Sequence, residues 1–215
     1  MSTRTTLIVA LTLVAIAVIF SAAVYNQLPE QVASHWGAND QVNGYMSRFW
    51  GAFLMPIIAL GMLGLFILVP NIDPLKSNIA KFREAFNAFI AAIMVFLLYI
   101  HVLTLAWNLG FQNFGMGQAM LPAVGLIFVF AGLMMRKAKR NFFIGIRTPW
   151  TLSSDRVWDE THRVGSWLFV AMGIVTMFTG LLGQAGIYVM FGAILIAALV
   201  PIIYSYVLYQ QELKS

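Results

Sequence analysis

Six long apolar runs dominate this chain of 215 residues, and they constrain its fold more than any other feature. A helix needs roughly 20 mostly apolar residues to cross the hydrocarbon core of a bilayer. Hydrophobic residues make up 60% of the chain and charged residues 10%, which excludes an ordinary globular domain. We therefore predict an all-α, polytopic membrane protein with six transmembrane helices, near residues 7–25, 49–69, 86–107, 120–135, 166–182 and 187–209.

The basic residues predict the orientation of these helices. With the N-terminus inside, the cations of both termini, of residues 76–83 and of the block at 136–163 all fall on the cytoplasmic side, and only Arg48 falls outside. Both termini are therefore predicted to be cytoplasmic. This bias accounts for the net charge of +5, so the lipid bilayer is the expected partner and no direct nucleic-acid partner is implied.

The first apolar run has a second interpretation. Arg4, an apolar core at 7–20 and the small residues at 21–23 also fit a secretory signal peptide with a cleavage site. We expect this run to be retained as a transmembrane helix. The chain has no cysteine, so it forms neither a disulfide nor a thiolate metal site.

Residues 26–48 form a polar external loop rich in turn-forming residues, and we expect this loop to be structured. Residues 1–70 would then be an N-terminal pair of transmembrane helices joined by it. Trp36 and Tyr45 suit the headgroup level of the bilayer. His35 can ligate a metal, sense pH or cap a turn, and we favour the structural role. The candidate residues of this loop are His35, Trp36, Gly44 and Tyr45.

His101 is the ionisable residue that lies deep in a predicted span, where an imidazole needs hydrogen-bond partners. A bond to Asn108, to Tyr99 or to a loop group would make it structural, and a binding role stays equally open. No span offers an acid or a second base to complete an ion path. That pattern counts against a proton-coupled transporter.

The predicted C-terminal part, residues 71–215, carries four transmembrane helices and a cytoplasmic loop at 136–165. Before this loop, Asp73 and Pro74 resemble a helix N-cap followed by proline at the first helical position. The loop begins with a basic cluster at 136–140 that stops membrane transfer. In residues 141–154, turn formers alternate with large apolar side chains that must dock on the bundle or the bilayer, and Pro149 should hold Thr148 extended.

An amphipathic helix is predicted from Ser154 to Val164, lying at the membrane interface. On it, Asp155, Asp159 and His162 share one face, at spacings that could hold a metal ion. The same residues also fit weak surface ion pairs at helical spacing, which we favour. We therefore predict no metal and no cofactor.

The segment NFFIGIRTPWTLSSDRVWDETHR resembles the signature of the SdpI family of bacterial membrane proteins. The matching positions are Asn141, Gly145, Arg147, Thr148, Pro149, Trp150, Thr151, Leu152, Val157, Trp158, Thr161 and His162. The earlier stretch LPEQVASHWGANDQVNGYMSR resembles the small uncharacterised domain that commonly precedes that signature. The candidate partner-binding residues are Asn141, Gly145, Arg147, Thr148, Pro149, Trp150, Trp158, Asp159 and His162.

This resemblance implies a multi-pass protein of the bacterial inner membrane that confers immunity to a secreted peptide toxin. It also implies a receptor role, in which the inner loop holds a transcriptional repressor at the membrane once toxin is bound. We prefer this non-enzymatic function. Two alternatives stay open: a small-molecule or ion transporter, and a membrane-embedded hydrolase that uses His162 as base with Asp159 or Asp155, or a metal on those groups.

Overall fold

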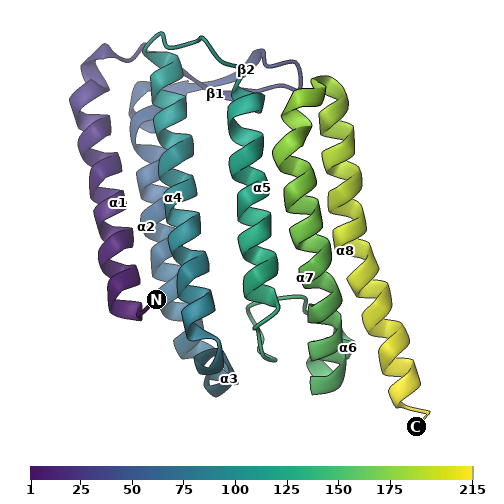
Figure 1. The fold of residues 1–215 in the computed structure, drawn as a ribbon. Helices are drawn as coiled ribbons and strands as arrows, with labels where there is room; N and C mark the ends of the chain where they lie inside the picture. The colour runs from purple at the N-terminus through teal and green to yellow at the C-terminus, as the bar shows by residue number, and fades with distance from the viewer. Residues whose placement is uncertain (215) are drawn as a thin grey trace.

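A computed structural model describes residues 1–214 and shows six long helices standing side by side (Figure 1). They are α1 (Thr3–Val24), α2 (Arg48–Ile72), α4 (Arg83–Asn108), α5 (Met116–Met135), α7 (Asp155–Thr179) and α8 (Gln184–Glu212). The shorter elements are η1 (Tyr25–Gln27), β1 (Gln31–Trp36), β2 (Val42–Ser47), α3 (Lys76–Lys81), α6 (Pro149–Ser153) and η2 (Gly180–Leu182).

The six long helices confirm the predicted fold class. Within residues 1–214, six helices are long and apolar enough to cross a membrane. Their outward faces carry large apolar side chains such as Ile19, Leu60 and Ile203, each more than half exposed. Lipid tails solvate such faces, whereas water would not. The chain is therefore a multi-pass membrane protein.

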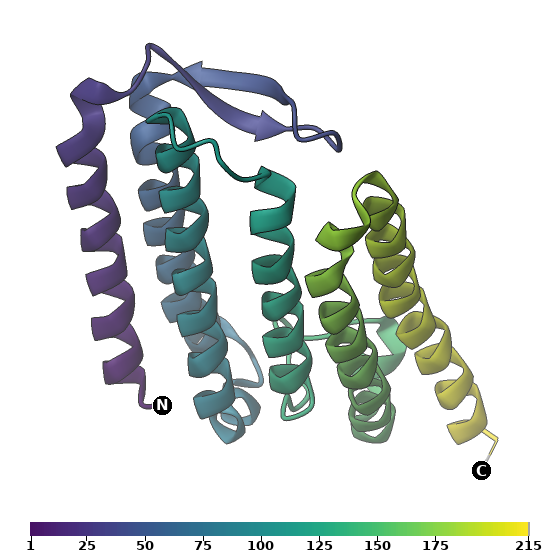
Figure 2. The same ribbon diagram turned by 45° about the horizontal axis from the view of Figure 1, so that its top comes forward.

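The helices pack as two units of three. Helix α1 packs against α2 and α4, while α7 packs between α5 and α8, and a contact between α4 and α5 joins the units. This division differs from the one predicted at residue 70, because α4 packs with the first two long helices. Figure 2 shows both units and the hairpin that extends over the gap between them.

The contact between α5 and α7 depends on small residues. A Cβ atom on Gly173 would lie 2.5 Å from the carbonyl oxygen of Gly125, and one on Gly132 would lie 2.7 Å from that of Ser166. Such backbone proximity is possible only where side chains are absent or very small. Glycines two turns apart thus bring α5 and α7 together along their length.

We expect Gly173→Ala to destabilise the protein by roughly 2 kcal/mol, because the added methyl group forces two packed backbones apart. The midpoint temperature of unfolding in detergent would fall. Gly192→Ala on α8 is the matched control, since a Cβ atom there meets no atom within 4 Å. Equal midpoints for the two variants would contradict this account of the α5–α7 contact.

The two ends of the bundle differ. The N-terminus, α3, α6 and the C-terminus lie at one end, called the signature end here, and the hairpin lies at the other, the hairpin end (Figure 1). Strands β1 and β2 pair antiparallel. The buried side chain of Val32 packs against Gly51 of α2, where no Cβ atom would fit. The hairpin is thereby attached to the N-terminal unit.

Three local expectations need correction. Residues 26–48 were expected to form a structured loop without strands, but a hairpin forms there. The interfacial helix expected at 154–164 is not separate: Ser154 accepts the N–H of Val157 at the N-cap, and α7 continues without a break to Thr179. Asp73 is not an N-cap, because it ends α2, and α3 begins only at Lys76.

Candidate functional site

The signature segment, residues 141–162, begins with a buried asparagine that organises the backbone around it. The Oδ1 atom of Asn141 accepts the N–H groups of Phe143 and Ile144, at 3.0 and 2.6 Å. Its Nδ2 atom donates to the carbonyls of Lys139 and Ile144, at 2.8 and 2.9 Å. An amide side chain can make this set of bonds, and an apolar residue would leave four backbone groups unpaired.

Gly145 and His162 form the centre of the segment. Gly145 has a φ of +114°, which side chains disfavour, and a Cβ atom there would lie 2.4 Å from Nε2 of His162. That Nε2 atom accepts the N–H of Ile146 at 3.0 Å, so the proton lies on Nδ1, which donates to the carbonyl of Trp158 at 2.8 Å. Both ring nitrogens of His162 are therefore engaged by backbone.

Trp158 holds the histidine ring in place. The two rings stack with centroids 4.0 Å apart, and the tryptophan is fully buried. Its indole N–H donates to the carbonyl of Ala138 at 3.0 Å, so the first turns of α7 are tied to the end of α5. The large aromatic body supplies apolar contact while its polar atom finds a partner.

Thr148 and Thr151 close the segment against α8. Thr148 caps α6 by accepting the N–H of Thr151 at 3.1 Å, and Thr151 accepts that of Thr148 at 2.9 Å, which forms a reciprocal capping box. The Thr148 hydroxyl also bonds to that of Ser205 at 3.1 Å. Beside them, Trp150 packs on Tyr206, with ring centroids 5.0 Å apart.

Two residues whose role was not predicted from the sequence join the segment to the N-terminal unit. Asp73 is 2% exposed, and its carboxylate accepts the N–H of Leu75 at 2.6 Å and that of Phe142 at 2.8 Å. Asn78 donates to the carbonyl of Arg140 at 2.9 Å. A polar residue in a short loop carries no sequence signal for a partner 60 to 70 positions away, so only the folded chain reveals these bonds.

The three residues weighed as metal ligands do not share a site. Asp159 pairs with Lys139 at 2.9 Å and Asp155 with Arg140 at 2.8 Å, while His162 points its ring nitrogens at backbone. In residues 1–214, no group of three His, Cys, Asp and Glu side chains is placed to hold a metal ion. The arrangement offers His162 neither a free nitrogen nor an acid partner for hydrolysis.

A few signature side chains remain exposed. Phe142 and Phe143 are 45% and 39% exposed, and Arg147 lies beside them, its guanidinium donating to the carbonyl of Phe142 at 3.1 Å. Pro149 is also exposed. The signature thus divides into buried residues that build the segment and a small aromatic and basic surface that is exposed.

At the hairpin end, the candidate residues do not converge on one point. The Nδ1 atom of His35 bonds to the side-chain oxygen of Asn43 across the hairpin. Gly44 faces His35, where a Cβ atom would lie 2.9 Å from that of the histidine. Trp36 packs edge-on against Trp107 of α4, with ring centroids 5.4 Å apart, and Tyr45 is exposed. The pairing of the two strands therefore accounts for the positions and contacts of His35 and Gly44.

His101 joins three helices of the N-terminal unit. Pro56 has no N–H group, which leaves the carbonyl of Ala52 without its helical donor, and the Ser21 hydroxyl donates to that carbonyl at 2.5 Å. Ser21 also bonds to Nε2 of His101 at 2.9 Å, so the imidazole supplies its N–H to this hydroxyl. The chain therefore uses His101 to stabilise a proline-containing helix crossing.

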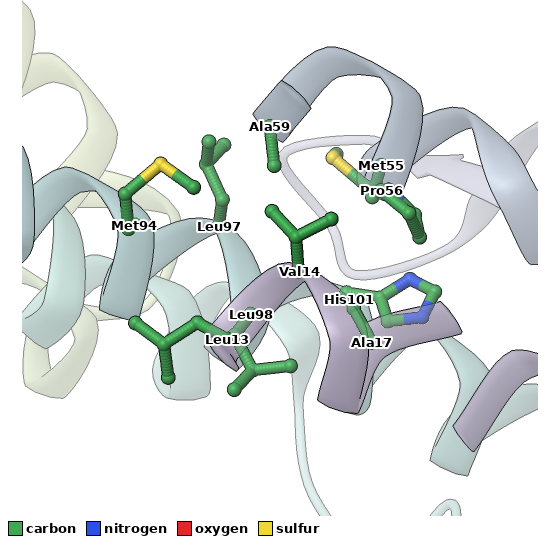
Figure 3. Close-up of a pocket in the computed structure, with 10 residues that line it drawn as sticks. All are labelled: Leu13, Val14, Ala17, Met55, Pro56, Ala59, Met94, Leu97, Leu98 and His101. Carbon is green, nitrogen blue, oxygen red and sulfur yellow. The ribbon is translucent and has the colours of Figure 1, made fainter. Parts of the chain in front are cut away.

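The partners predicted for His101 were wrong. Tyr99 donates to the carbonyl of Ala119 at 2.9 Å, and Asn108 bonds to the backbone of Ala33. A cavity of about 10 Å³ adjoins the imidazole and is lined mostly by apolar side chains (Figure 3). Such a volume holds roughly one water molecule and no larger ligand.

Comparison with known proteins gives two family matches, one in each half of the chain. Residues 12–60 match the domain of unknown function DUF1648, and residues 137–205 match the SdpI/YfhL protein family. The chain is 28% identical to Immunity protein SdpI of Bacillus subtilis (strain 168) over 211 residues, which covers 95% of this chain and 96% of that protein. No solved structure matches. The matches confirm that the chain resembles the SdpI/YfhL protein family, with the signature segment inside the matched residues 137–205.

Proposed function

We propose that this protein confers immunity to a secreted peptide toxin from within the cytoplasmic membrane of a bacterium. The observation that carries the proposal is the similarity to Immunity protein SdpI over 95% of the chain. A match of that length includes the hairpin as well as the signature segment. The basic residues at the signature end support a cytoplasmic location for that end and an external location for the hairpin.

The geometry of the signature supports a non-enzymatic function. Its polar side chains Asn141, Thr151 and His162 are buried, and their hydrogen bonds go to the backbone of the segment itself. Residues bonded in this way position a loop. A hydrolase would instead need a nucleophile or a metal-bound water facing a substrate cavity.

We also propose that the exposed surface of Phe142, Phe143 and Arg147 is where a cytoplasmic repressor is held. Two aromatic rings beside a cation suit a protein partner, because aromatic residues and arginine contribute strongly to interfaces. Capture and release of the repressor require that the toxin-bound and toxin-free states of this protein differ in their affinity for it. The hydrogen bonds of Asp73 and Asn78 offer a route by which a change in the N-terminal unit reaches this surface.

The immunity proposal predicts that the full-length chain raises survival when it is expressed in sensitive bacteria. The cells lack an SdpI relative and are exposed to the toxin against which the Bacillus subtilis protein acts. Survival is counted as colonies and compared with cells that carry an empty vector. The Arg147→Gln variant should protect as well as the wild type, because its side chain is exposed and its loss leaves the fold intact.

Unchanged sensitivity of cells that contain the full-length protein in their membrane would refute immunity to that toxin. Loss of protection in Arg147→Gln at normal protein level would place the inner surface in the protective mechanism itself. A deletion of residues 141–162 is unsuitable for this test, since it removes α6 and the first turns of α7.

A further inference from the structure

Two recesses meet at Asp40, at the tip of the hairpin. The larger has a volume of about 450 Å³ and is lined by Asp40, Tyr45, Trp107 and Phe114, among others. The smaller has a volume of about 230 Å³ and lies between the hairpin tip and the ends of α5, α7 and α8. Asp40 lines both, so the two recesses adjoin at this residue.

The conformation of Asp40 places this carboxylate at the start of α5. Its φ is +58°, in the left-handed region that aspartate and asparagine tolerate better than most residues. The Oδ1 atom accepts the N–H of Gly117 at 2.7 Å. The Oδ2 atom occupies space that a side chain on Gly115 would fill, since a Cβ atom there would lie 2.5 Å from it. No residue in 1–214 donates a hydrogen bond to Oδ2.

The surroundings of Asp40 favour a cation. The hairpin end carries one lysine or arginine, Arg48, and its guanidinium donates to the carbonyl of Pro29 and lies over the ring of Tyr25. The histidine of the hairpin, His35, bonds to Asn43 instead. Asp40 therefore has no ion-pair partner among the described residues. Aromatic walls add to this attraction, because the faces of tyrosine, tryptophan and phenylalanine rings attract cationic groups.

We propose that the recesses at Asp40 bind a lysine or arginine side chain of the peptide toxin, with the neighbouring toxin residues lying on either side. This inference rests on the proposed immunity function and specifies which chemical group of the toxin binds at the hairpin end of the protein. Recesses on both sides of one carboxylate suit a chain that continues past its cation in both directions. A lipid headgroup, in contrast, ends at its amine.

Asp40 also explains how such binding would involve both three-helix units. The residue belongs to the hairpin, which packs on α2, and its hydrogen bond goes to the first turn of α5. An occupant at Asp40 therefore lies beside the hairpin and α4 of the first unit and beside the start of α5 in the second. The cytoplasmic end of α5 leads directly into the signature segment.

The test uses purified full-length protein in uncharged maltoside micelles and the peptide Gly-Leu-Lys-Leu-Phe-Gly amide with an N-terminal uncharged coumarin. Fluorescence anisotropy measures its binding, and a twin with acetyl-lysine removes only the charge. Asp40→Asn is the key variant, because asparagine keeps the left-handed backbone and an oxygen that can accept from Gly117. Glu30→Gln, the other acid at this end, is the control.

We expect the charged peptide to bind saturably, and both Asp40→Asn and the neutral twin to weaken binding about tenfold, the loss expected for one charge-assisted contact. Glu30→Gln should bind as the wild type does. Equal binding by wild type and Asp40→Asn, equal weakening by Glu30→Gln, or displacement of the peptide by added phosphatidylethanolamine would each overturn the proposal.

The survival assay separates this inference from the function on which it rests. If the wild type protects and Asp40→Asn does not, both the immunity function and the Asp40 site are supported. If the two protect equally, the Asp40 site is refuted and immunity remains. If the wild type fails to protect, the immunity proposal fails whatever the peptide measurement gives.

Discussion

Gly145→Ala is expected to destabilise the protein by roughly 3 to 5 kcal/mol and to remove protection in the survival assay. The alanine must adopt a φ of +114°, which costs about 1 to 3 kcal/mol. Its Cβ atom would also lie 2.4 Å from Nε2 of His162 and displace the ring from the N–H of Ile146. A buried N–H without an acceptor adds about 1 to 3 kcal/mol. The midpoint of thermal unfolding in detergent measures the loss.

Gly61→Ala is the matched control for this substitution. Gly61 lies in α2, and a Cβ atom there meets no atom within 4 Å. Its midpoint should equal or slightly exceed that of the wild type, because alanine is the better helix former. A Gly145→Ala protein as stable as Gly61→Ala would show that neither the left-handed backbone nor the contact with His162 matters.

Asp73→Ala is expected to cost roughly 3 to 5 kcal/mol and to detach the signature segment from the N-terminal unit. The buried carboxylate accepts two backbone N–H groups, of Leu75 and Phe142, and each charge-assisted bond contributes about 1.5 to 3 kcal/mol. Thermal unfolding measures the loss of stability. Protease cleavage after Arg147, which is exposed, should become faster because the loop is less restrained.

Two further variants make the Asp73 result specific. Asp73→Asn keeps one acceptor oxygen and should lose about half as much stability as the alanine variant. Asp159→Ala removes an ion pair with Lys139 that is about half exposed, and should change stability by less than about 1 kcal/mol. Similar midpoints for Asp73→Ala and Asp159→Ala would contradict the structural role assigned to Asp73.

The sequence alone predicted the six spans well, because each is recorded locally as a continuous apolar run. Helices such as α2 and α4 lie within a few residues of the predicted runs. The boundary of α7 was missed by eleven residues, since charged residues from Asp155 onward suggested a separate helix. The helix continues because Trp158 and His162 are buried against α5 and the loop before α6, which hydropathy cannot reveal.

The sequence also identified the segment that resembles the SdpI signature, but not what its residues do. Asn141, Gly145 and His162 were candidates for partner binding, and the structure instead shows them making the hydrogen bonds and close contacts of the segment itself. Arg147 remains exposed. A motif shows which residues occur together. It does not separate the buried residues that hold the segment in shape from the exposed residues that make its surface.

By itself, the sequence determined that this chain crosses a membrane six times and carries the SdpI signature, because hydropathy and motif spacing are local properties. Only the tertiary structure decided which polar residues are bound internally and which are free. Asp73 and Asp40 are both single acids in short loops, yet one is buried against Phe142 and the other keeps an oxygen open at the hairpin tip. Their difference arises from backbone groups contributed by distant parts of the chain, which come together only when the helices pack.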